Sequence, residues 1–233
     1  MESAGLATTS ISLIREHTEK IRPPRALWVP FELGRPLGAP NDPEFQTDVL
    51  RASLALLERE SGPVLEDYPH DAPASGGEAW ACPVALPGGE AGDQEARLLR
   101  EVELLQPWYE EAVRSRGRSA VGLSGVAGVD TISSFLAGFV SGEPGTPPEG
   151  ASEEMPFLLR YLADDIKAFY FEAATAQPGR SATSGALNDW LYKETTLGEV
   201  LYDLRDKLAA SEDQREKMSA GGLIPLTYAQ RPQ

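Results

Sequence analysis

The chain has 233 residues with 36 acidic and 21 basic side chains, and its formal net charge is −15. This acidic excess argues against nucleic-acid binding, which needs a basic surface, and it also disfavours contact with an anionic membrane surface. The lack of an apolar run of roughly 18 residues, of a signal peptide and of a second cysteine predicts a cytoplasmic protein without membrane spans or an intramolecular disulfide.

Two apolar runs near the amino terminus predict two buried strands. The first, TTSISLI at 8–14, is rich in β-branched residues, and the second, ALWVPF at 26–31, follows a polar turn or short helix at 15–20. A loop at 32–43, ELGRPLGAPNDP, comes directly after the second strand. Because α/β sheets place ligands at the carboxyl ends of their strands, this loop is the best candidate for a binding site by position.

The loop combines two opposite charges with two glycines. Arg35 can hold a carboxylate or phosphate in a bidentate manner, and Gly34 and Gly38 allow a ligand to approach the backbone closely. We therefore predict that Glu32, Gly34, Arg35 and Gly38 bind a substrate. The alternative is a tight turn in which Arg35 pairs with Glu32 inside the loop.

The same stretch resembles a known family. The resemblance is carried by Ala4-Gly5, Thr8, Val29-Pro30, Arg35-Pro36-Leu37-Gly38 and Pro40. Over about residues 4–60 the chain is similar to the carboxyl-terminal part of the selenoprotein B subunits of glycine, sarcosine, betaine and D-proline reductases. The resemblance implies a module of reductase ancestry. The redox-active selenocysteine and cysteines of those reductases lie upstream of this module, and Arg35 stands where that family is expected to carry histidine.

A helix and a long linker follow the loop. Asn41 or Asp42 can cap a helix whose apolar residues recur at helical spacing to about Glu60. The segment at 62–94 is rich in proline and glycine, which predicts a linker. The sequence thus predicts an α/β module at 1–61, a linker at 62–94 and a helical domain at 95–233. The predicted fold class is mixed α/β and mostly helical.

Beyond the linker, apolar residues at helical spacing predict a series of helices. We expect them at 95–116 with a kink at Pro107, from Asp130 to 140, from Ser152 to 177, at 184–211 and at about 212–218. The long helices are expected to pack antiparallel.

Cys82 is the only thiol and hence the candidate catalytic nucleophile or redox group. It lies near Trp80 in the predicted linker, and no basic residue stands within ten positions of it. No local charge therefore favours the thiolate. The alternative is a small apolar residue that packs beside Trp80.

The two histidines, His17 and His70, stand outside any zinc-binding spacing, so we predict no metal site. Carboxylates on the late helices, Asp165, Glu172 and Glu194, are of the type that builds metal sites in helix bundles, but these helices contain no histidine. We expect Glu194 to pair with an arginine or to cap a backbone group instead.

The string Gly122-Leu-Ser-Gly-Val matches a nucleophile elbow only in part, because Val126 replaces the last glycine. It is therefore not taken as a catalytic motif.

Two functional hypotheses remain open. The first is an enzyme or enzyme subunit, an oxidoreductase-like relative of the selenoprotein B reductases, with Cys82 as thiol and Arg35 as anchor for a small carboxylate- or amine-bearing substrate. The second is a non-catalytic binding or assembly subunit, with the module as scaffold and the helical domain as partner surface. The sequence identifies no cofactor for either hypothesis.

The sequence also predicts a partner chain. Parallel strands are buried on both faces, and two strands rarely stand alone. We therefore expect a homo- or hetero-oligomer in which a second copy or a different chain covers the remaining apolar surface. The alternative is a monomer whose late helices and residues 63–86 fill the gap.

Overall fold

The computed structural model describes residues 2–71, 82, 84, 86, 93–143, 145–178 and 182–232. The chain divides into two compact units, residues 1–78 and 79–233. A small sheet near the amino terminus is followed by a helical region, and the described residues are 56% helical. The predicted fold class, mixed α/β and mostly helical, is confirmed.

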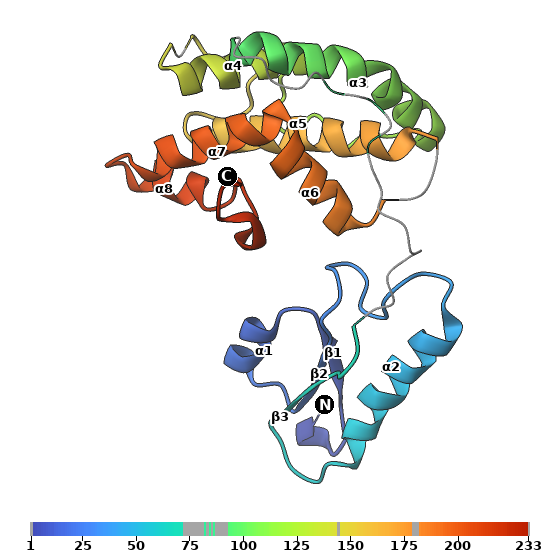
Figure 1. Ribbon diagram of the computed structural model, residues 1–233. Helices are drawn as coiled ribbons and strands as arrows, with labels where there is room; N and C mark the ends of the chain where they lie inside the picture. The colour runs from blue at the N-terminus through green and yellow to red at the C-terminus, as the bar shows by residue number, and fades with distance from the viewer. Residues whose placement is uncertain are drawn as a thin grey trace. The chain divides into compact units, whose positions relative to one another are not determined.

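The first unit is built around a three-stranded parallel sheet with the order β1-β2-β3 (Figure 1). The strands are β1 at Ser10–Ser12, β2 at Arg25–Trp28 and β3 at Val64–Asp67. Helix α1, Arg15–Ile21, connects the first two strands, and α2, Pro43–Ala55, with the short 3-10 helix η2, Leu56–Glu58, connects the last two. A further 3-10 turn, η1, occupies Glu2–Ala4.

Strand β3 lies inside the segment that the sequence assigns to a linker. It pairs with β2 in parallel register, with Arg25 opposite Val64 and Trp28 opposite Asp67. The sequence anticipates only two strands here. The reason is that VLED at 64–67 has just two apolar residues and no alternation long enough to predict a strand.

One face of the sheet packs against α2. Leu27, Val29 and Phe31 alternate along and beyond β2 and are almost fully buried, as are Val49 of α2 and Leu56 of η2. Alternate residues of the strand point to the same face of the sheet, and the apolar residues of α2 lie on one face of the helix. These two apolar faces pack against each other and bury both sets of side chains. Asp42 caps α2 as predicted, because its side chain accepts the Phe45 N–H at 3.1 Å.

The second unit is helical. Its elements are α3 at Gln94–Arg116, α4 at Val129–Ser141, α5 at Phe157–Ala176, α6 at Ser184–Glu194, α7 at Thr196–Ala209, α8 at Gln214–Ala220 and a 3-10 turn, η3, at Leu226–Tyr228. Helices α3 and α5 lie side by side along most of their length, and α4 and α7 pack against this pair (Figure 1). Helix α3 continues through Pro107.

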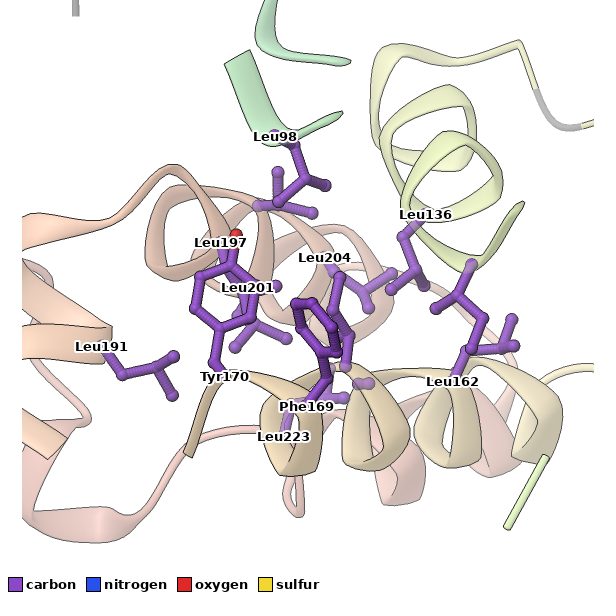
Figure 2. Packing of buried hydrophobic residues seen from close by; sticks show 14 of the residues in the cluster. Leu98, Leu136, Leu162, Phe169, Tyr170, Leu191, Leu197, Leu201, Leu204 and Leu223 are labelled. Carbon is purple, nitrogen blue, oxygen red and sulfur yellow. The ribbon is translucent and has the colours of Figure 1, made fainter. Parts of the chain in front are cut away.

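A single apolar core holds these helices together. Figure 2 shows Phe169 and Tyr170 of α5 surrounded by leucines from other helices. Phe169 and Tyr170 are completely buried, and so are Leu98 of α3, Leu136 of α4 and Leu201 of α7. Burying side chains of this size contributes about 1.5–3 kcal/mol each, so the core is the main source of stability in this unit.

Two helix boundaries differ from the sequence prediction. The single helix expected at 184–211 is broken at Thr195, whose side chain accepts the Gly198 N–H at 3.0 Å and donates to the Leu191 carbonyl at 2.7 Å. Thr195 therefore ends α6 and caps α7. The helix expected from Ser152 begins at Phe157, because Ser152 is held by the preceding loop through its N–H bond to the Ser124 carbonyl at 2.8 Å.

Candidate functional site

The loop predicted to bind substrate folds into two tight turns. The N–H of Arg35 donates to the Glu32 carbonyl at 3.0 Å, and the N–H of Gly38 donates to the Arg35 carbonyl at 3.0 Å. Gly34 and Gly38 have φ angles of 88° and 81°, in the left-handed region that glycine adopts without strain. The glycines are therefore accounted for by the turn geometry.

The two charged side chains of this loop, Glu32 and Arg35, pair with each other. The Arg35 guanidinium lies 3.6 Å from the Glu32 carboxylate, and the two side chains are 50% and 42% exposed. This is the alternative arrangement that the sequence left open. An exposed pair of this kind is easily exchanged for a ligand, so substrate binding at this loop stays a prediction.

At the carboxyl ends of the strands, charged and aromatic side chains converge. Arg15 of α1 donates through Nε to both carboxylate oxygens of Asp67 at 3.1 and 3.2 Å, which joins the end of β3 to α1. Tyr68, just after β3, donates its hydroxyl to Asp48 of α2 at 2.7 Å. Burial, and then this bond to a carboxylate, raise the pKa of Tyr68 to about 12. Both contacts join secondary-structure elements and are structural.

Cys82 belongs to the second unit, where it packs half-buried against the helical core. Its thiol donates to the side-chain oxygen of Gln177 at 3.6 Å. Burial raises the pKa of Cys82, and the negative charge of Glu194 raises it further, while hydrogen bonds to Val84 and Gln177 act in the opposite direction. Trp80, its predicted neighbour, lies outside the described residues.

The histidines are exposed and belong to the first unit. His17 lies on α1, and the ring of His70 contacts the ring of Tyr68 at a centroid distance of 5.6 Å. Within the described ranges, no group of three or more histidine, cysteine, aspartate or glutamate side chains is placed to hold a metal ion.

Among the described carboxylates of the helical unit, Asp165 accepts the largest number of hydrogen bonds, and it is completely buried. Its Oδ1 accepts the N–H groups of Gly122 and Leu123 at 2.9 and 2.8 Å, and its Oδ2 accepts the N–H and hydroxyl of Ser124 at 2.9 and 2.6 Å. The hydroxyl of Ser124 is thus committed to Asp165, and the partial nucleophile-elbow motif has a structural role.

The other late carboxylates also have structural surroundings. Glu172 accepts the Ser119 hydroxyl and the Ala120 N–H, both at 2.8 Å. Glu194, placed by the sequence on an inward stripe, is exposed at the end of α6. The break at Thr195 is the reason, because it separates the apolar stripe of α6 from that of α7.

Glu101 is a buried carboxylate that the sequence did not single out. It sits on the apolar face of α3 with 1% of its surface exposed. It accepts the Tyr170 hydroxyl at 2.8 Å and the backbone N–H groups of Thr196 and Leu197 at 2.7 and 3.4 Å. The signal available in the sequence was its position between Leu98 and Leu105 on the helical face.

The outer edge of β3 is open within the part of the chain that the structure describes. The N–H of Val64 donates to the carbonyl of Pro24, just before β2, at 3.0 Å, and the N–H of Tyr68 donates to the Trp28 carbonyl of β2 at 2.8 Å. In a parallel ladder the intervening residues, Leu65 and Asp67, direct their backbone groups to the other side, where no described residue pairs with them. A groove of about 450 Å³ lies beside this edge, and its lining includes Leu56, Glu58 and Glu66.

Comparisons of the chain with models of protein families, with curated proteins and with solved structures give no match. The resemblance to selenoprotein B subunits therefore stays a prediction. None of the helices that the structure describes is long and apolar enough to cross a membrane.

Proposed function

We propose that this protein is a non-catalytic assembly subunit whose small sheet is extended by a strand from a different polypeptide. The observation that carries the proposal is the open outer edge of β3, where the backbone groups of Leu65 and Asp67 have no described partner. An unpaired strand edge is a template for a further strand, and the main-chain hydrogen bonds supply affinity.

The groove beside β3 supports this assignment over the β1 edge. It lies between β3 and the end of α2, and the apolar part of its wall is formed by Leu27, Ala52 and Leu56. An added strand would place alternate side chains into this groove while its backbone pairs with β3. Its lining carries the carboxylates of Glu58, Glu66 and Asp67, of which Glu66 is paired with Arg59 of the same lining. Glu58 is therefore the carboxylate opposite which the added strand is expected to present lysine or arginine.

The net charge of −15 favours a different chain over a second copy. Two identical chains of this charge repel each other, and like charges opposed across an interface are unfavourable. A partner strand with basic side chains is instead attracted by the negative charge of this chain. The oligomer predicted from the sequence is thus proposed to be a hetero-oligomer.

The enzyme hypothesis receives less support from the surroundings of its thiol. A nucleophilic cysteine needs a lowered pKa, from a cation or a helix amino terminus. Burial and Glu194 instead raise the pKa of Cys82. Arg35 lies in the other unit and pairs with Glu32. Thiol chemistry stays a prediction, which a Cys82→Ser variant tests in the complete cellular pathway: unchanged flux is incompatible with it.

The strand-addition proposal is tested with Leu65→Pro. Proline at this position removes the outward N–H and leaves the bonds from Val64 to the Pro24 carbonyl and from Tyr68 to the Trp28 carbonyl in place. Leu65→Ala, which keeps the N–H, is the matched control, and circular dichroism checks the fold of both variants. We expect affinity capture from native extract to recover a polypeptide that Leu65→Ala retains and Leu65→Pro loses.

Hydrogen exchange provides the direct readout. The amide protons of Leu65 and Asp67 should exchange rapidly in the isolated chain and become protected in the complex. If they are already protected in the 25.1 kDa monomer, the chain closes its own sheet edge and the proposal fails. Equal capture by both variants would also contradict it.

A further inference from the structure

A groove of about 540 Å³ runs along the helical unit between α3 and the start of α4. Its α3 wall consists of residues spaced at successive turns on one face: Leu99, Val102, Gln106, Pro107 and Tyr109. The facing wall is formed by the loop residue Val121 and by Val129 at the start of α4. Most of this lining is apolar, and it belongs to the helical unit, whereas the edge of β3 belongs to the first unit.

Two polar side chains of the groove have part of their hydrogen-bonding capacity engaged inside the unit. Tyr109 donates its hydroxyl proton to Ser119 at 3.0 Å, and Gln106 donates from its amide nitrogen to Glu110 at 2.9 Å. In each case the oxygen that remains can only accept. Pro107 has no N–H, so the Glu103 carbonyl one turn earlier lacks its helical donor.

Two carboxylates line the same groove. Glu103 is paired with Arg100 at 2.7 Å. Asp130 has no hydrogen-bond or ion-pair partner among the described side chains, and its Oδ1 lies over Gly128, where an added Cβ would be 2.5 Å away. Asp130 is exposed in the first turn of α4 and is the carboxylate of this groove without an ion-pair partner among the described side chains.

We propose that this groove binds a small organic cation, an amine attached to an apolar or aromatic body. The ammonium group pairs with Asp130, while the apolar body lies against Leu99, Val102 and Val129. The ring of Tyr109 offers a face for a cation or an aromatic group. An anionic ligand would meet the carboxylates of Glu103 and Asp130.

The size of the groove selects a small molecule over a protein segment. Its volume of about 540 Å³ falls in the range of roughly 300–1,000 Å³ typical of small-molecule sites. A stable protein interface involves about 20–30 residues on each side, which is more than these walls provide. The site belongs to the helical unit and does not depend on the proposed strand addition.

The test uses the full chain and isothermal titration calorimetry with tryptamine as the probe. Indole-3-propionate, with the same ring and a carboxylate, is the matched ligand control. Asp130→Asn removes the proposed counter-ion, and Val121→Trp fills the groove. Glu212→Gln changes an exposed acidic residue that does not line the groove, so it removes the same charge elsewhere on the chain.

We expect saturable binding of tryptamine and none of indole-3-propionate. Asp130→Asn should weaken binding by about fivefold, the effect of one partly exposed ion pair, and Glu212→Gln should leave it unchanged. Val121→Trp should abolish binding; if that variant fails to fold, Asp130→Asn decides. No binding of tryptamine, equal binding of the acid, or equal affinity of Asp130→Asn and Glu212→Gln would overturn the proposal. Binding of a basic apolar peptide without tryptamine binding would overturn it in favour of a protein partner.

Discussion

The buried carboxylate of Glu101 on α3 accepts the backbone N–H of Thr196, the first residue of α7, at 2.7 Å. A carboxylate at this position satisfies a donor that the helix leaves unpaired and faces the positive end of its dipole. The bond therefore fixes the start of α7 to the middle of α3. It also makes the stability of the helical unit depend on the ionisation of one buried group.

We predict that Glu101→Gln flattens the pH dependence of stability. Burial, the largest effect, raises the pKa of Glu101 above its ordinary value of 4.5, although the bonds from Thr196 and Tyr170 act against it. The contribution of such a group is present below the unfolded pKa and is lost as the pH rises through the folded pKa. Glutamine cannot ionise, so its contribution to the free energy of unfolding does not change with pH.

Urea unfolding between about pH 4 and pH 8 measures this effect. As the pH rises, the parent chain should lose unfolding free energy relative to Glu101→Gln. The loss should be about 1.4 kcal/mol for each unit by which burial raises the pKa of Glu101 in the folded state. Glu103→Gln is the control, because Glu103 is on the same helix with its side chain 69% exposed. Parallel pH profiles for the parent chain and Glu101→Gln would contradict the prediction.

A second prediction concerns Asp165, whose two oxygens accept four hydrogen bonds from Gly122, Leu123 and Ser124. In Asp165→Asn the amide NH₂ faces donors, so two of these bonds are lost and donors oppose each other. We expect a loss of about 3 kcal/mol in unfolding free energy. Asp164→Asn breaks only the partly exposed pairs with Arg160 and Lys167, and should lose less than about 1 kcal/mol. Similar losses in the two variants would be incompatible with this role.

Local sequence patterns predict most of the elements of this fold. The β-branched run at 8–14, the Asp42 cap and the apolar stripe of α5 each depend on neighbours within one or two turns, so they can be read from spacing alone. The break at Thr195 could not be predicted in this way. The Thr195 side chain makes the break through its bonds to the Leu191 carbonyl and the Gly198 N–H, whereas the apolar spacing of the sequence continues across it.

The candidate site residues were less predictable for the same reason. Glu101 and Asp165 occur in helices where charged residues are expected to face solvent, and their partners lie far along the chain. The Glu32–Arg35 pair was foreseen as an alternative because both residues belong to one short turn. The open edge of β3 was missed because the strand itself is only four residues long.

A third prediction tests the approach of α6 and α7. A Cβ on Gly198 would lie 2.4 Å from the Leu191 carbonyl oxygen and 3.1 Å from the Tyr192 backbone. Gly198→Ala should therefore destabilise the helical unit by about 1–3 kcal/mol. Gly185, near the start of α6, has only the Thr183 hydroxyl within 4 Å, at 3.8 Å, so Gly185→Ala should be neutral or stabilising by up to about 1 kcal/mol. Thermal unfolding followed by circular dichroism compares the midpoints of the two variants. A neutral Gly198→Ala would mean that α6 and α7 are not so closely apposed.

The last prediction concerns the reactivity of Cys82. Burial is the main cause that raises the pKa of this thiol above its ordinary value of 9.0, and Glu194 adds to it. Only the thiolate attacks an alkylating reagent, so iodoacetamide should modify the folded chain at least about tenfold more slowly than the urea-unfolded chain at neutral pH. Glu194→Gln removes the neighbouring negative charge and should increase the rate by roughly twofold, whereas Glu212→Gln should not change it. The opposite result would be faster alkylation of the folded chain than of the unfolded chain, with an inflection of the alkylation rate below pH 9.0. That result would identify an activated thiol. Such a thiol would favour the enzyme hypothesis over the assembly function.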